Sequence, residues 1–152
     1  MSLKTSGITH PDNHTAAVTL YPTKHFDFVL SVKFVQDSGA LNHLDQIAED
    51  HTRIERPHRL GDSVYWLALA SAADGAVKLT VRAPDDAPPP DEAAMQAAIE
   101  HANNRFFMDV DMAAVEKALE GDSYGEEILA RFFPARPANY PSACEALIKS
   151  VV

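Results

Sequence analysis

Hydrophobic and polar residues follow a strand-like pattern in the first half of the chain and a helix-like pattern in the second. Four segments alternate apolar and polar residues with the period of two that is typical of a strand. They are residues 16–21, 53–60, 63–70 and 76–82. Gly61-Asp62 and Asp74-Gly75 separate the last three, and both pairs favour tight turns because they tolerate positive φ. These three segments therefore predict an antiparallel meander.

The hydrophobic pattern of residues 26–35 fits both a strand and a helix. Phe26, Phe28, Leu30, Val32 and Phe34 fall on one parity, which predicts a strand. Phe26, Leu30 and Phe34, together with Val29, also lie at helical spacing. The residues alone leave both structures open.

Helical spacing begins after the proline- and aspartate-rich spacer of residues 84–90. Met95, Ile99, Ala102 and Phe106 form one stripe and predict a helix over residues 91–107. A shorter stripe predicts a second helix that ends at Gly121. Ser123-x-x-Glu126 is typical of a capping box and predicts a third helix that runs to Pro134. Strands followed by helices predict an α+β fold, in which helices cover one face of an antiparallel sheet.

The two ends of the chain differ from this central α+β domain, which we place at residues 15–133. Residues 1–14 are polar, and we expect them to be disordered or loosely held. Residues 134–152 begin with a loop of three prolines, which keeps the chain extended. Ser142-x-x-Glu145 then opens an apolar helix that reaches Val151-Val152 without a stop signal. We expect this tail to be a junction loop and the first helix of an absent further domain.

The charge of the chain is negative and uneven. The net charge is −9, and residues 85–127 alone hold twelve acids and two bases, Arg105 and Lys117. Binding to nucleic acid needs a basic face that neutralises phosphates. The composition therefore argues against DNA binding by this chain in isolation.

Motifs for chemistry are scarce. His10 and His14 are four positions apart, but they lie in the polar N-terminal segment without a helix signal, and no histidine lies beside a cysteine pair at ligand spacing. We therefore expect no metal. We also expect no cofactor and no catalytic residue in this chain. Asp109 and Asp111 precede a predicted helix, where carboxylates cap backbone amides. The single Cys144 excludes an internal disulfide. With no signal peptide and no apolar run of about 18 residues, we expect a cytoplasmic protein without a membrane partner.

The order of the segments from residue 18 to 152 resembles the N-terminal domain of the DNA-3-methyladenine glycosylase II family, in the helix-hairpin-helix DNA glycosylase superfamily. Phe26-Asp27-Phe28 is similar to the aromatic-Asp-aromatic start of a family helix. Residues 104–107, followed by Asp109, resemble the family's Arg-hydrophobic-Phe-x-Leu step. Residues 144–151 resemble its Phe-Glu-x-Leu-x-x-x-Ile helix, with Cys144 in place of phenylalanine.

The resemblance implies a TATA-box-binding-protein-like α+β fold with a helix at residues 26–35. It also implies a parent enzyme of base-excision repair that hydrolyses the N-glycosidic bond of alkylated purines, through an aspartate in a C-terminal helix-hairpin-helix domain. That domain would be this chain's intramolecular partner and would make the contacts with DNA. This chain would supply scaffold and part of the lesion pocket, and would be inactive alone.

Two residues are candidates for direct roles. Phe34 matches the aromatic that the resembling enzymes place in the pocket for an extruded base, although a core position suits its stripe as well. Arg136, in the junction loop, is a candidate for a phosphate contact or for domain docking.

A different class of protein also fits the negative charge and the lack of catalytic motifs. It is a stand-alone acidic α+β module that binds a protein or a small ligand and has no enzymatic activity.

Overall fold

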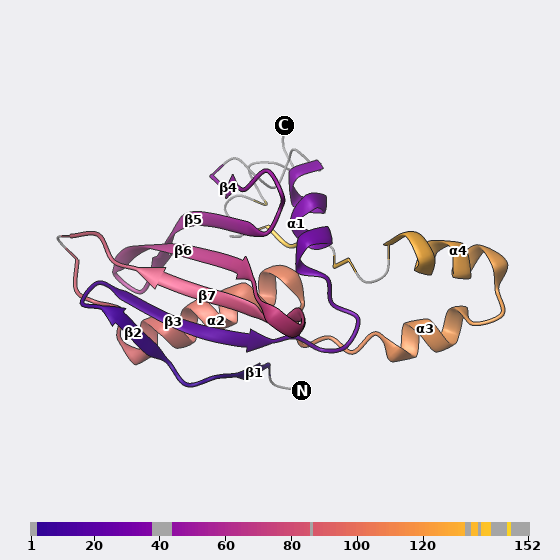
Figure 1. Ribbon diagram of the computed structural model, residues 1–152, viewed down its shortest axis with the longest axis horizontal. Coiled ribbons are helices and arrows are strands. Elements are labelled where there is room, and N and C mark those ends of the chain that lie inside the picture. The colour runs from indigo at the N-terminus through magenta and orange to yellow at the C-terminus, as the bar shows by residue number, and fades with distance from the viewer. Residues whose placement is uncertain are drawn as a thin grey trace.

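The computed structural model of the chain describes residues 3–37, 44–85, 87–132, 135–136, 138–140 and 146. Over these residues the fold is α+β, as the sequence predicts, with one seven-stranded antiparallel sheet and four α-helices. In Figure 1, α2 (Glu92–Phe106) lies behind the sheet, while α3 (Ala113–Leu119) and α4 (Ser123–Phe132) project to one side. We call α3 and α4 together the arm.

The sheet contains the predicted meander. Its strand order is β1 (Lys4–Thr5), β3 (Thr15–Tyr21), β7 (Val77–Arg82), β6 (Ser63–Ser71), β5 (Arg53–Leu60) and β4 (Gln46–Ile47), and β2 (Thr9–Asp12) also pairs with β3. The two predicted turns are confirmed. Gly61 between β5 and β6 has φ of 60°, and Asp74 and Gly75, in the 3-10 turn Ala73–Gly75, have φ of 56° and 73°.

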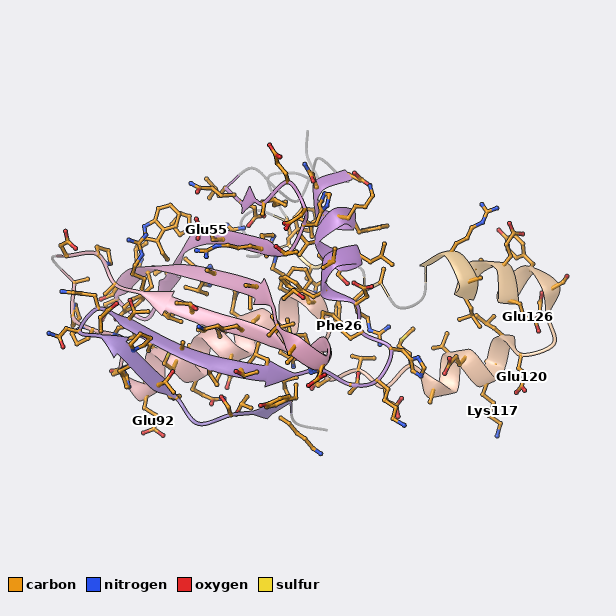
Figure 2. The ribbon with its side chains drawn as sticks, in the orientation of Figure 1. Phe26, Glu55, Glu92, Lys117, Glu120 and Glu126 are labelled. Atoms are coloured by element: carbon orange, nitrogen blue, oxygen red, sulfur yellow. The ribbon has the colours of Figure 1, made fainter. Side chains whose placement is uncertain are left out.

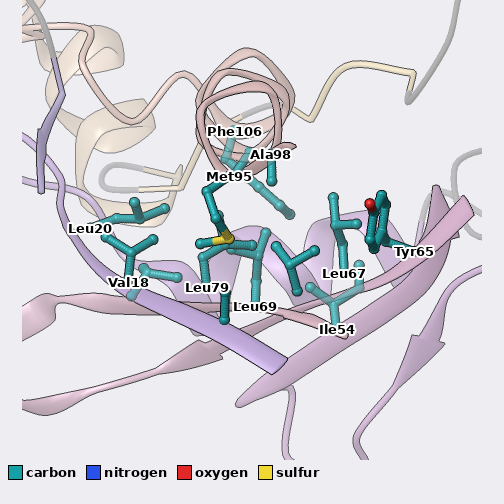
Figure 3. Packing of buried hydrophobic residues seen from close by; sticks show 14 of the residues in the cluster. Val18, Leu20, Ile54, Tyr65, Leu67, Leu69, Leu79, Met95, Ala98 and Phe106 are labelled. Atoms are coloured by element: carbon teal, nitrogen blue, oxygen red, sulfur yellow. The ribbon is translucent and has the colours of Figure 1, made fainter. Parts of the chain in front are cut away.

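One face of the sheet forms the core. Alternate residues of β3, β5, β6 and β7 point to this face and are at most 7% exposed, among them Val18, Leu20, Ile54, Tyr65, Leu67, Leu69, Val77, Leu79 and Val81. Met95, Ala98 and Phe106 of α2 pack against them (Figure 3). Because each large apolar side chain contributes about 1.5–3 kcal/mol when fully buried, the sheet and α2 stabilise each other strongly.

Residues 28–37 are helical, which settles the choice between the two templates. Helix α1 (Phe28–Asp37) buries Phe28, Ser31, Val32 and Val35, whose spacing is that of one helix face. Asp27 caps it, because its Oδ1 accepts the N–H of Leu30 at 2.9 Å. The ring of Phe28 meets Phe106 of α2 edge to face at 5.8 Å, so α1 joins the same core.

The N-terminal segment, expected to be disordered or loosely held, forms two edge strands. All residues of β1 and β2 are exposed, yet both pair with β3. Ser6 between them exchanges backbone and side-chain hydrogen bonds with Thr19 of β3 at 2.8 and 2.9 Å. Backbone pairing therefore orders a segment that has no apolar pattern of its own.

The helices of the second half agree with their predictions, except for the residue that caps α4. Helix α2 closely matches its predicted range, and α3 ends before Gly121. The cap of α4 is Asp122 and not Ser123, because Asp122 Oδ1 accepts the N–H groups of Tyr124 and Gly125 at 2.9 and 3.1 Å. The carboxylate of Asp122 therefore takes the capping role that was predicted for the hydroxyl of Ser123. The predicted capping box at residues 142–145 lies outside the described residues.

Candidate functional site

Helix α1 presents Phe34 to the outside. Phe34 lies outside the buried face of α1 and is 46% exposed. The structure therefore does not place Phe34 in the core, the alternative that its stripe allowed. An exposed phenyl ring on a helix whose other face is fixed in the core is a rigid apolar surface.

Phe34 lines a hollow of about 200 Å³ between α1 and the end of the arm. Its apolar lining comes from Leu30, Phe34 and Ala135, and its charged lining from Lys33, Asp37 and Arg131. Lys33 Nζ and Asp37 Oδ2 are 2.6 Å apart on the helix surface. An aromatic ring beside aliphatic carbon can receive a flat ring. The surrounding charged groups can hydrogen-bond to the polar edge of such a ring.

Arg136 also lies against α1, but inside the protein. Its backbone N–H donates to Ser31 Oγ at 3.0 Å, and the residue is only 2% exposed. Burial lowers the pKa of its guanidinium, and the negative charge of Asp111 acts in the opposite direction. This position attaches the junction loop to α1. A phosphate contact by Arg136 stays a prediction, and its burial favours a structural role.

A buried ionic cluster connects the edge of the sheet to α2. Arg105, in the last turn of α2, donates two hydrogen bonds to Asp45, Nη1 to Oδ1 at 3.0 Å and Nη2 to Oδ2 at 2.6 Å. Arg56 Nη1, from the core face of β5, lies 3.7 Å from the same Oδ1. The three side chains are at most 5% exposed and border a cavity of about 20 Å³. That volume holds about one water molecule and no larger ligand.

Two histidines lie beside this cluster. The rings of His58, on β5, and His101, on α2, lie against each other with centroids 3.7 Å apart and an interplanar angle of 31°. Burial lowers the pKa of His101 to about 3, and the positive charges of His58, Arg105 and Arg56 add to the effect. A general base works best with a pKa near the working pH. A ring that is this hard to protonate is a poor general base at neutral pH.

This cluster was not predicted, although the amino-acid sequence carries a signal for it. Arg56 and His58 share the parity of Ile54 and Leu60 on β5, so two polar residues occupy core-facing positions. Polar residues at such positions are buried only with partners. The partner Asp45 could not be identified, because it lies in a polar segment outside any long apolar pattern.

A hollow of about 650 Å³ lies between the end of β3 and the start of the arm. Lys4, Lys24 and His25 line it together with Asp109 and Asp111. Asp111 Oδ1 accepts the N–H of Ala113 at 2.9 Å, which confirms its predicted role beside α3. Across the described ranges, no three histidine, cysteine, aspartate or glutamate side chains gather as metal ligands would.

The arm exposes apolar side chains. Val115, Tyr124 and Ile128 are 41%, 71% and 38% exposed, and no residue of α3 is buried. Figure 2 shows Glu120 and Glu126 on the same arm, away from the sheet. Tyr124 and Ile128 lie about one turn apart on α4, so their exposed side chains share one side of that helix, as is typical of a surface that a partner covers.

Comparison of the chain with models of protein families, with curated proteins and with solved structures found no match. None of the helices in the described part of the chain is long and apolar enough to cross a membrane.

Proposed function

We propose that this chain is the N-terminal domain of a cytoplasmic DNA glycosylase of base-excision repair, one that hydrolyses the N-glycosidic bond of alkylated purines such as 3-methyladenine. The observation that carries the proposal is the helix at residues 28–37. Alternation along the sequence fits a strand there equally well, whereas the resemblance to the glycosylase family implies a helix. The order of strand, helix, meander and helix also agrees with the family's TATA-box-binding-protein-like domain.

Phe34 supplies one wall of the lesion pocket in this proposal. An enzyme that acts on a base must extrude it from the duplex and hold it between aromatic and apolar side chains. Phe34 is exposed on a fixed helix and lines a hollow with Leu30 and Ala135. These features suit a pocket that a second domain completes.

A helix-hairpin-helix domain outside this sequence supplies the rest. It carries the catalytic aspartate and contacts the DNA, and this chain alone releases no base. The exposed apolar residues of the arm, Val115, Tyr124 and Ile128, fit a surface that this domain covers. The attachment of Arg136 to Ser31 holds the junction loop against the helix that carries Phe34.

Excision assays on alkylated DNA test the proposal. The full-length product of the source gene should release 3-methyladenine, whereas the 152-residue chain should release none. In the full-length protein, Phe34→Ala should lower kcat/KM about 5- to 150-fold, which corresponds to the roughly 1–3 kcal/mol of one stacked base. The matched control is Tyr21→Ala, since Tyr21 is 49% exposed and lies at the end of β3, outside the hollow that Phe34 lines.

The excision assays distinguish the proposed function of the protein from the proposed role of Phe34. Base release by the chain alone, or no release by the full-length product, contradicts the proposed function. Normal excision by the Phe34→Ala variant contradicts only the role of Phe34.

The second candidate is a stand-alone acidic module that binds a protein through the arm. It is favoured by one observation, that acidic residues and exposed apolar residues occur together on α3 and α4. The mass of the native protein, detected in source cells with an antibody to this chain, distinguishes the two. A species near 16.6 kDa supports the module. A species of roughly twice that mass, with room for a further domain of usual size, supports the glycosylase.

A further inference from the structure

The sheet has a second face, opposite the core, which we call the open face. Figure 1 looks onto it, and no helix within the described residues crosses it. Its side chains are the alternate residues of the same strands that build the core. Trp66 of β6 points to this face, because its neighbours Tyr65 and Leu67 are buried on the other.

The open face carries positive charge in a protein that is strongly negative. Arg53, Arg59, Lys78 and Arg82 point to it, and Glu55 is the one carboxylate among the outward-facing residues of β3, β5, β6 and β7. Helix α2 lies behind the sheet and the arm projects to its side (Figure 1), and Glu92, Glu120 and Glu126, which belong to these helices, lie off the open face (Figure 2). Because charges interact over about 8–10 Å at physiological salt, a ligand on this face meets mainly the cations.

Two of these cations are available to a ligand. Glu55 Oε2 accepts a hydrogen bond from Arg53 Nε at 3.2 Å, and Arg59 lies 3.7 Å from Asp62 in the turn. Lys78 and Arg82, by contrast, have no acidic partner within 4.0 Å among the described residues. Both are exposed on the same strand, β7, four positions apart, which is a separation of about 13 Å along the strand.

The register places an aromatic ring beside this pair. Arg82 is the cross-strand partner of Trp66, and Lys78 is the partner of Ala70. Between them, Thr80 pairs with Ala68, so the middle of the face has small side chains. This part of the open face is therefore a surface of small side chains, with Lys78 at one end, Arg82 at the other and the indole of Trp66 beside Arg82.

We propose that the open face binds single-stranded nucleic acid, with a base stacked on Trp66 and backbone phosphates at Lys78 and Arg82. Surfaces that bind single strands combine aromatic platforms with cations that follow the backbone. An acidic peptide would need the cations but not the ring. The inference does not rest on the proposed function, because the open face does not include Phe34 and lies on the other side of the sheet from α2.

The test uses the intact chain and a dye-labelled oligothymidylate of about 12 nucleotides, within the site sizes of single-strand-binding domains. Binding is followed by anisotropy of the dye and by emission of Trp66, which is the single tryptophan of the chain. We expect saturable binding with quenching of Trp66. The slope of log K against log salt should be about −1.4 to −2, which corresponds to two or three phosphates.

Variants assign the effect to the open face. Lys78→Glu/Arg82→Glu should weaken binding about tenfold or more at low salt and make the salt slope shallower. Trp66→Leu should weaken binding and leave the slope unchanged. The matched control, Lys24→Glu/Lys117→Glu, changes the net charge equally at exposed sites elsewhere and should bind as the native chain does. Circular dichroism of each variant confirms that it is folded.

Three results would overturn the proposal. One is no binding of the oligonucleotide at low salt. Another is equal weakening by the control pair, which would mean that only net charge matters. The third is polyglutamate displacing the oligonucleotide and quenching Trp66 as strongly, which would identify the open face as a site for acidic protein segments.

Discussion

Asp45 places one buried carboxylate between the guanidinium groups of Arg56 and Arg105. Asp45→Asn removes this negative charge with almost no change of shape and leaves buried Arg105 without the carboxylate that accepts two of its hydrogen bonds. Breaking a buried pair from one side costs about 3–5 kcal/mol. We therefore expect the free energy of unfolding in urea to fall by about that amount, or the domain to be unfolded at 25 °C.

An exposed pair provides the comparison. Asp37→Asn breaks the surface ion pair with Lys33. The Lys33 side chain is 51% exposed and the Asp37 side chain is 61% exposed. Surface pairs contribute about 0–1 kcal/mol, so this variant should keep its stability. Equal effects of the two substitutions would show that the buried cluster does not hold the core together.

His101 makes the stability of the fold depend on pH. Its pKa is about 3 in the folded protein because the ring is buried, against 6.5 for the ordinary side chain. Between these pH values the unfolded chain binds a proton that the folded chain does not bind. The contribution of neutral His101 is therefore complete above about pH 6.5 and is lost as the pH falls toward 3, by up to about 1.4 kcal/mol per pH unit.

The measurement is urea unfolding at several pH values in that window. His101→Gln should flatten the decline of stability with falling pH, because the titrating ring is gone. His10→Gln, at an exposed position of β2, should leave the slope unchanged. An identical slope for His101→Gln and the native chain would contradict the assignment.

Two helix caps of the same chemical kind should have different consequences. Asp27 caps α1, which is part of the core, whereas Asp122 caps α4, in the arm. Loss of either cap should cost about 1 kcal/mol locally. Asp27→Ala should lower the global free energy of unfolding. Asp122→Ala should leave the global value unchanged and speed amide exchange in the arm alone, because α3 and α4 contact mainly each other.

Hydrogen exchange read by mass spectrometry, with chemical denaturation of both variants, measures these effects. A global loss of stability from Asp122→Ala would mean that the arm unfolds together with the body. No loss from Asp27→Ala would mean that the core alone fixes α1.

Strands, turns and the long helix could be predicted because each depends on neighbours in sequence. The alternation over residues 63–70 and the stripe from Met95 to Phe106 are local and strong, and β6 and α2 match them. The alternation over residues 26–35 gave no unique answer. There the Asp27 cap and the burial of Val32 and Val35 favour the helix, and only the second of these requires the rest of the fold.

The features that could not be predicted depend on partners far along the chain. Asp45 and Arg105 are 60 positions apart, and no local pattern connects them. The side of α1 on which Phe34 lies was equally open until the packing of Phe28 against Phe106 fixed the helix. The residue type of Phe34 could be noticed in the sequence, but its exposure depends on this tertiary contact.

The molecule as a whole presents different chemistry on different sides. The open face is basic and carries Trp66, whereas the arm is acidic and apolar. Phe34 lies on a third side, with the junction loop at Ala135 and Arg136. The net charge of −9 is therefore unevenly distributed over the surface, and it does not predict the sign of the charge on a given face.

The pairing of β3 with β7 has a consequence for synthesis on the ribosome. Thr15 pairs with Arg82, so 67 further residues must be added after Thr15 before its partner exists. At about 5–20 residues per second this takes roughly 3–13 s. During that time Val18 and Leu20, both nearly fully buried in the finished protein, have neither β7 beside them nor α2 to cover them. The nascent chain thus passes through a stage of several seconds in which β3 is a natural target for chaperones.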